Sequence, residues 1–287
     1  MLSVILALIS SVFFAFANVA MQLGLLGMDH FTGLLVNLTT NSSLLWCYLA
    51  LRSDRIVLAT PVNLVFAGVG LLVPAVSRLC VIHGLGRLGT SITSAVVSCS
   101  PLFAIGFAVF FLKELPTLLN LVGALSIIVG IVLVSWRGPA KTWRVRHLLF
   151  PLSAAFLFAM RDNLVRFGLL LTPFPVLAGA IAASSSALTI GTVYVARRLR
   201  TWKAATPTGW LWFLASGVAN FVSYIFMFTA LGLDKVSVVS PIVNCFALFV
   251  LPLAHFLLKG VERITPRKVG ATVLVVLGVL LISWEKL

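Results

Sequence analysis

Acidic side chains are scarce in this chain of 287 residues, which has 7 Asp and Glu against 21 Lys and Arg. Charged residues make up only 10% of it, whereas soluble globular proteins contain about 25%. So few charges cannot cover the surface of a water-soluble protein, which excludes a soluble enzyme. A nucleic-acid-binding domain is excluded for the same reason, although the net charge is +14.

Cysteines and catalytic motifs are also scarce. The four cysteines lie in apolar stretches, with neither a CxxC motif nor a histidine at zinc spacing, so they predict no disulfide scaffold and no zinc site. The sequence contains no GxxxxGK[ST] phosphate-binding motif and no HExxH metalloprotease motif. We therefore expect a protein that is not an enzyme and that uses no cofactor and no metal ion.

Hydrophobic residues, in contrast, make up 61% of the chain. A helix that crosses a bilayer needs about 20 apolar residues, and turn residues or charges separate the apolar stretches here. The fold class predicted is an all-α integral membrane protein with ten transmembrane helices. The expected spans are 2–26, 31–51, 62–84, 89–111, 117–136, 147–171, 174–196, 209–231, 236–258 and 267–284.

The sequence also repeats itself. The segment LGRLGTSITSAVVSCSPLF from Leu85 aligns with LGLDKVSVVSPIVNCFALF from Leu231, at an offset of 146 residues. Near the front of each copy, FFAFANVAMQLGL from Phe13 aligns with LFAMRDNLVRFGL from Leu157. The repeat predicts two units of five helices each.

An odd number of spans in each unit places the second unit in the membrane upside down relative to the first. We expect residues 1–137 to form the first five-helix repeat, 138–146 a basic connecting loop and 147–287 the second repeat, within one structural unit. Two inverted repeats around a site at the membrane midplane are typical of secondary transporters.

The stretch from Gly86 to Leu133 carries a family resemblance. It reads GRLGTSITSAVVSCSPLFA, then FLKEL, then LVGALSIIVGIVL, and it resembles the drug/metabolite transporter (DMT) superfamily, EamA-type. The matching features are Pro101, the turn acid Glu114, and the glycines Gly123 and Gly130. The resemblance implies a ten-helix carrier with a central cavity between its halves, and it places the fifth and tenth helices outside the core.

Charged residues deep inside the spans are candidates for the substrate site, because burial of a charge in a membrane is costly. Asp162 is the only acidic residue that lies far inside a predicted span. The basic residues at similar depth are Arg78, Arg161 and Arg166. Asp162 precedes Arg166 by four positions, which favours an ion pair along one helix. That pair would leave Arg78 and Arg161 without an acid, and an unpaired guanidinium binds a carboxylate or phosphate.

Neutral polar residues four positions apart lie on one helical face and extend the candidate site. In the repeat, Asp162 matches Asn18, Arg166 matches Gln22 and Arg78 matches Tyr224, so one half carries charge where the other is neutral. Helix packing is the alternative role for such residues. The predicted substrate-binding residues are Arg161, Asp162, Arg166, Arg78, Asn18, Gln22, Asn220, Tyr224 and Asn244.

Together these features predict a secondary-active membrane transporter that moves a small polar metabolite, anionic or zwitterionic and amino-acid-like, by alternating access. The alternatives are an exporter of amphipathic or cationic drugs, anchored by Asp162, and a lipid flippase. We expect a multi-pass protein of the plasma (inner) membrane, a monomer or a homodimer, whose partners are a small-molecule substrate and membrane lipids, with no nucleic acid.

Two arguments about orientation disagree. Loops on the side of the termini carry five Lys and Arg, whereas loops on the opposite side carry thirteen. The positive-inside rule therefore places the termini outside the cytoplasm. The family resemblance places both termini in the cytoplasm, so the sequence leaves both orientations open.

Overall fold

The computed structural model describes residues 1–52, 60–73, 76–77, 80–81, 83–84, 93, 96–97, 99–135, 145–198, 206–257 and 266–284. Every element assigned in these residues is a helix, which confirms the predicted all-α class. The elements are α1 (Leu2–Gly24), α2 (His30–Arg52), α3 (Val62–Leu72), α5 (Ser100–Phe107), η1 (Ala108–Leu112), α6 (Leu118–Ser135), η2 (Val145–Leu148), α7 (Leu149–Leu171), α8 (Pro175–Arg198), α9 (Pro207–Leu233), α10 (Val236–Asn244), α11 (Phe246–Leu257) and α12 (Pro266–Trp284).

Each of the ten predicted spans contains a helix among these residues. Five helical segments are long and apolar enough to cross a membrane: 2–24, 30–52, 146–171, 175–196 and 207–233. Shorter apolar helices occupy described parts of the other five spans. The predicted boundaries are close to the observed ones because Gly, Pro and charged residues interrupt the apolar stretches.

Two predicted helices are broken at equivalent points in the two halves. Cys99 and Cys245 both lie in a turn, and each donates its backbone N–H to the carbonyl three residues earlier, at 3.1 Å. Proline lies near both breaks: Pro101 is in the first turn of the helix after the first break, whereas Pro241 lies four residues before the second. The breaks recur at an offset of 146 residues, as the repeat predicts.

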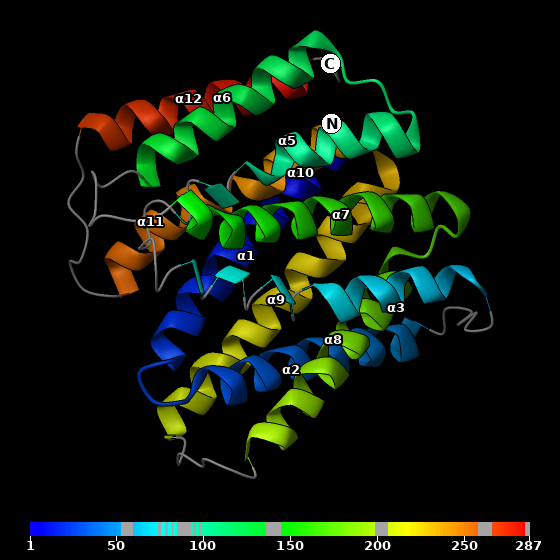
Figure 1. Cartoon of the computed structure of the whole chain (residues 1–287), viewed down its shortest axis with the longest axis vertical. Helices are drawn as coiled ribbons and strands as arrows, with labels where there is room; N and C mark the ends of the chain where they lie inside the picture. The colour runs from blue at the N-terminus through cyan, green and yellow to red at the C-terminus, as the bar shows by residue number, and fades with distance from the viewer. Residues whose placement is uncertain are drawn as a thin grey trace.

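Helices α6 and α12 pack against each other at one edge of the bundle, with α2, α3 and α8 toward the opposite edge (Figure 1). A Cβ atom at Gly123 would lie 2.7 Å from the carbonyl oxygen of Gly278, and one at Gly130 would lie 2.7 Å from that of Ala271. Glycine therefore allows the two backbones to approach closely. A Cβ at Gly270 would meet nothing within 4 Å, so that glycine does not serve this contact.

Matching contacts in the two halves show that the repeat is structural as well as sequential. Gly24 of α1 packs on the ring of Phe213 in α9, and Gly168 of α7 packs on the ring of Phe66 in α3. Both rings are buried, with exposures of 0% and 1%. In each pair, the first helix of one half packs against the third helix of the other half. This is the pattern expected of two inverted copies.

A second pair of contacts fixes the register of the third helices. Gly70 of α3 lies against the carbonyl oxygen of Ala182 in α8, and Gly217 of α9 lies against that of Asn37 in α2. Both Phe66 with Phe213 and Gly70 with Gly217 are 147 residues apart. At this offset Tyr224 would match Ser77, one residue before the predicted match, Arg78, which lies outside the described residues.

The close contact at Gly70 yields a test of this packing. A Cβ at Gly70 would overlap the carbonyl oxygen of Ala182 and the hydroxyl of Ser185, whereas one at Gly68 would meet nothing within 4 Å. We expect Gly70→Ala to destabilise the protein by about 1–3 kcal/mol, because overpacking displaces a backbone. The matched variant Gly68→Ala should be neutral or stabilise by up to about 1 kcal/mol. Thermal unfolding in detergent checks both, and equal effects would contradict the contact.

Candidate functional site

An ion pair lies in the middle of α7. Arg161 donates from Nε (2.9 Å) and Nη2 (2.8 Å) to Oδ1 of Asp162, and the second carboxylate oxygen accepts a 2.6 Å hydrogen bond from Ser240 of α10. Arg161 is 9% exposed and Asp162 is 3% exposed. Ser240 precedes the break at Cys245 by five residues. The buried charges therefore lie beside a discontinuous helix, as in many transporter sites.

The predicted pair between Asp162 and Arg166 does not form. Asp162 instead pairs with its neighbour Arg161, and Arg166 pairs with Glu114, which follows η1, at 2.8 Å. Helical spacing allows an i to i+4 pair, but a long arginine side chain reaches any acid that the tertiary fold brings near. The expectation that Arg161 has no acid partner was therefore also wrong.

Arg161 nevertheless has hydrogen-bonding capacity to spare. A guanidinium has five N–H donors, and two of them serve Asp162. Among the described residues, no acceptor binds the Nη1 group. The guanidinium carbon lies 5.5 Å from the centre of the Phe158 ring, and Tyr224 of α9 is within electrostatic range. Arg161 is thus held in place while one edge of its donor fork stays unbonded.

Amide and hydroxyl groups line the contact between α2 and α9. Asn37 donates to Oγ of Ser216 at 2.7 Å, and Asn220 donates to Oδ1 of Asn37 at 2.9 Å. Asn41, one turn after Asn37, is 0% exposed, and no described residue forms a hydrogen bond with its amide nitrogen or amide oxygen. Asn220 was predicted for the site, whereas Asn37 and Asn41 were missed. Their four-residue spacing is the signal that could have found them.

The structure separates the remaining predicted residues. Asn18 is half-buried and donates to the carbonyl of Phe14 in its own helix at 2.7 Å, and Gln22 is exposed. Asn244 donates to the carbonyl of Ser240 at 2.8 Å. Arg78 lies outside the described residues. The contacts thus bring Asp162, Arg161 and Ser240 together, with Tyr224 near them, and leave Asn18 bonded within its own helix.

A second polar network links the halves at the face of the bundle where α1 begins and α7 and α9 end, which we call the N-terminal face. Oε1 of Glu114 accepts from Arg166, and Oε2 accepts from the backbone N–H of Val236 at 3.0 Å. Arg166 also donates to the carbonyl oxygens of Leu231 (2.9 Å) and Gly232 (3.0 Å). Glu114 therefore joins the first half to the last turn of α9 and the start of α10.

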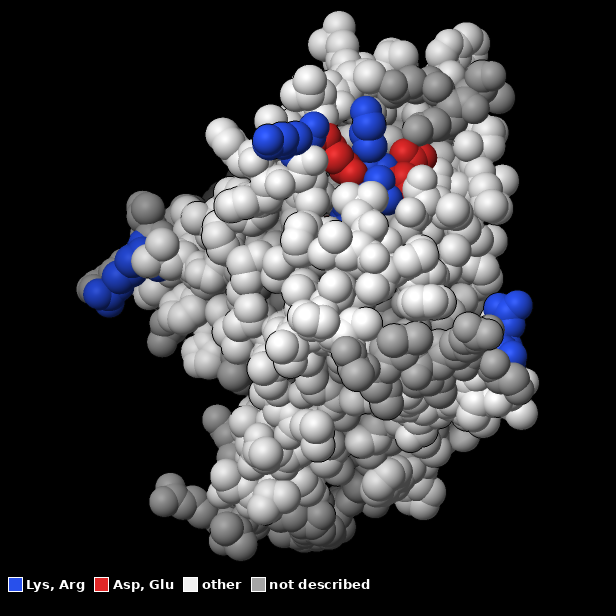
Figure 2. Space-filling model, turned by 90° about the vertical axis from the view of Figure 1, so that its right-hand side faces the viewer, with Lys and Arg blue, Asp and Glu red and all other residues white. Residues whose placement is uncertain are grey.

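Two further contacts between the halves lie at the N-terminal face. Ser3 of α1 donates to Asp234 at 2.7 Å, and Lys235 donates from Nζ to the carbonyl of Leu115 at 3.1 Å. The space-filling view of this face shows acidic and basic side chains gathered together (Figure 2). Polar contacts therefore join the two halves at the N-terminal face.

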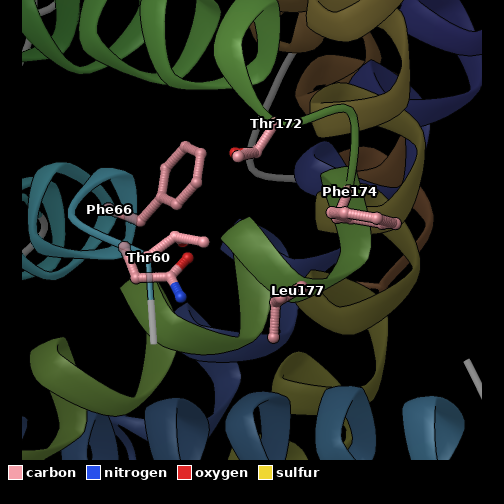
Figure 3. Close-up of a pocket in the computed structure, with 6 residues that line it drawn as sticks. Thr60, Phe66, Thr172, Phe174 and Leu177 are labelled. Carbon is pink, nitrogen blue, oxygen red and sulfur yellow. The ribbon is translucent and has the colours of Figure 1, made fainter. Parts of the chain in front are cut away.

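One small cavity lies between the start of α3 and the turn that joins α7 to α8 (Figure 3). Its volume is about 30 Å³, which is enough for a water molecule or so but not for a metabolite. The described residues that line it are Thr60, Asn63, Phe66, Thr172, Phe174 and Leu177. No predicted site residue is among them, and we do not assign it to the substrate.

A larger open groove of about 560 Å³ lies along α5, α6 and α7. The described residues that line it are all apolar: Val96, Cys99, Leu102, Phe103, Val132 and Leu152. None of these described lining residues offers a charged group to a polar solute.

Comparison with known proteins agrees with this architecture. The model of the EamA-like transporter family matches residues 1–136 and again residues 146–284. The chain belongs to the EamA-like transporter family, and is therefore a multi-pass membrane transporter within the drug/metabolite transporter superfamily, not an enzyme.

A solved structure, described only as a crystal structure of a protein, shares the fold. Its TM-score is 0.83 at 14% sequence identity, and the match covers 99% of this chain and 96% of that one. No curated protein matches this chain in sequence. The family confirms the resemblance drawn from the segment 86–133, and at this identity the solved structure informs the fold alone.

Proposed function

We propose that the protein is a secondary-active carrier that moves a small polar metabolite, anionic or zwitterionic, across the membrane by alternating access. The observation that carries this proposal is the Arg161–Asp162 pair in the middle of α7, in which Asp162 holds the guanidinium and Nη1 has no hydrogen-bond partner among the described residues. A guanidinium that is held in place and keeps free N–H donors can bind a carboxylate or phosphate through two parallel hydrogen bonds.

The alternating-access part of the proposal rests on the N-terminal face. Its contacts, from Glu114 to Arg166 and from Ser3 to Asp234, each join one half to the other. A carrier with two inverted halves must break such contacts when it opens that face, and form others when it closes it. We expect these contacts to be intact in the state in which the N-terminal face is closed.

Export of a cationic drug anchored on Asp162 has less support. Both carboxylate oxygens of Asp162 already accept hydrogen bonds, two from Arg161 and one from Ser240. A cation would have to displace the neighbouring guanidinium, which stays charged at any physiological pH. A flippase of lipids draws support from the open apolar groove along α5, α6 and α7, and lipid transfer between leaflets is therefore measured beside solute uptake.

Reconstituted protein tests the proposal. We expect proteoliposomes to take up radiolabelled carboxylates or zwitterions from a panel that also includes cations and sugars, and Arg161→Gln to lower that uptake at least ten-fold. Ser153→Ala is the matched control on α7, because Ser153 is exposed and bonds only to Leu149 of its own helix. Uptake unchanged by Arg161→Gln, or lipid transfer without solute uptake, would overturn the proposal.

A further inference from the structure

We infer that Asn41 and Asn220 form the second pole of the substrate site, opposite Arg161, and bind an ammonium group of a zwitterionic cargo. This inference rests on the proposed function, because it takes Arg161 as the group that binds the cargo's carboxylate. Its own evidence is a set of buried amide atoms that the protein leaves without partners.

Asn41 is the first such group. It is 0% exposed in the middle of α2, yet its amide nitrogen and oxygen both lack a hydrogen-bond partner in the part of the chain that the structure describes. The amide oxygen of Asn220 is likewise buried and unpaired, although its nitrogen bonds to Asn37. A buried amide without partners costs free energy, and inside a membrane no bulk water compensates it. These atoms are therefore suited to a polar ligand.

Two contacts place Asn41 beside Asn220 and Tyr224. Asn37, one turn earlier on α2, bonds to Asn220. Leu45, one turn later, lies near Phe228, because a Cβ atom added at Gly179 would lie within 4 Å of both side chains. Asn41 falls between these contacts on the same helical stripe. Asn220, Tyr224 and Phe228 form the corresponding stripe of α9, so Asn41 faces the turn from Asn220 to Tyr224.

The same stripe connects the amides to the ion pair. Tyr224 stacks on Phe228, with ring centres 5.4 Å apart, and it interacts electrostatically with Arg161. Tyr224, one turn after Asn220 on α9, thus connects the amides to the guanidinium. A molecule with a carboxylate at one end and an N–H donor group at the other matches this order of groups.

The inverted repeat argues that packing does not require these amides. At the offset of 145 residues set by the glycine contacts, Asn37 matches Ala182 and Asn41 matches Ser186; at 147 residues, Asn220 matches Val73. Ala182 and Val73 thus occupy the equivalent positions without an amide. Ser186 bonds fully, to the carbonyls of Gly70 (2.8 Å) and Val73 (3.1 Å). The amide side chains are therefore present in one half only, and the equivalent helices of the other half pack without them.

Charge balance selects the zwitterion. Arg161 and Asp162 neutralise each other, and both are buried. A simple anion would leave the site with an uncompensated negative charge, which a low-dielectric interior disfavours. A zwitterion adds no net charge. Its ammonium donates hydrogens that the free amide oxygens of Asn41 and Asn220 accept.

A thermal-shift experiment on the purified protein tests the inference. The probes are α-amino acids, each compared with the α-hydroxy acid of the same carbon skeleton, which keeps the carboxylate and lacks the ammonium. We expect at least one amino acid to raise the melting temperature more than its hydroxy acid. Asn41→Leu should abolish that preference and weaken amino-acid binding at least ten-fold, while binding of the hydroxy acid changes less than two-fold.

Stability without ligand separates a binding role from a packing role. Because Asn41 has no partner to lose, Asn41→Leu should leave the melting temperature of the ligand-free protein unchanged or raise it. Asn37→Leu and Ser186→Ala should lower it, since both residues lose hydrogen bonds. A ligand-free protein that is strongly destabilised by Asn41→Leu would overturn the inference in favour of packing.

The failures of the two proposals are distinguishable. If Arg161→Gln abolishes binding of both probe classes but Asn41→Leu keeps the preference for amino acids, the carrier proposal stands and the amide pole is wrong. If Arg161→Gln leaves both probe classes bound, the proposed function itself is wrong.

Discussion

Replacing Asp162 with Asn should abolish transport and lower stability, because it leaves the neighbouring guanidinium buried without an acid. Arg161 is 9% exposed, and its two hydrogen bonds within α7 both go to Asp162. Removal of one partner of a buried ion pair typically costs about 3–5 kcal/mol. We expect a clear fall in melting temperature in detergent, together with uptake reduced to background in proteoliposomes.

The double variant Arg161→Gln with Asp162→Asn distinguishes a fold defect from a functional defect. It removes both charges and keeps side chains of similar size, so stability should return close to that of the parent protein. Transport should not return, because the group that binds the anion is gone. Recovery of transport in the double variant would show that the pair serves structure alone, and retention of transport by Asp162→Asn would contradict the requirement for the carboxylate.

Replacing Glu114 with Gln should open the N-terminal face. The carboxylate bonds to Arg166 in the second half and to the backbone of Val236 at the start of α10. Hydrogen bonds to charged groups contribute about 1.5–3 kcal/mol each, and about 1.4 kcal/mol changes an equilibrium ten-fold. The closed state should therefore lose at least about ten-fold in relative population, and slower transport should follow because closure becomes the less favourable step.

Thiol labelling measures this shift. Val238 lies on α10 between Val236 and Ser240 and is 0% exposed, so a cysteine there reacts with a water-soluble maleimide only when the face opens. In a background without native cysteines, we expect Val238→Cys to react about ten-fold faster when Glu114 is Gln. Arg52→Gln is the control for loss of a surface charge, since Arg52 is exposed and contacts Tyr48 of its own helix. Equal rates in all three backgrounds would exclude Glu114 as a latch.

Membrane insertion was predictable from the sequence because it depends on composition and on local periodicity. Apolar stretches of sufficient length, interrupted by residues such as Asp29 and Pro116, predicted the helices and most of their ends. The repeat at 144–148 residues predicted an inverted pair, and contacts such as Gly24 on Phe213 and Gly168 on Phe66 agree with it. The predicted helices agree with the structure because a bilayer leaves the backbone few alternatives to helices.

The partners of the buried charges were not predictable in the same way. Spacing along α7 favoured a pair between Asp162 and Arg166, but Glu114, 52 residues away, takes Arg166 instead. Arg161 pairs with the carboxylate of the adjacent residue, Asp162. Helix periodicity does not predict a contact between neighbouring residues. The choice depends on which acid lies within reach after the halves pack together, and a single sequence does not contain that information.

By itself, then, the sequence determined that this protein is helical, spans the membrane many times, consists of two inverted halves and keeps ionisable groups within them. The tertiary structure alone decided the partners of those groups. Arg166 bonds to Glu114 across the N-terminal face, Asp162 bonds to Ser240 within the second half, and Asn41 has no hydrogen-bond partner among the described residues. The physical reason is range. Helix formation and insertion follow from neighbouring residues, whereas pairing of buried polar groups follows from contacts between helices far apart in the chain.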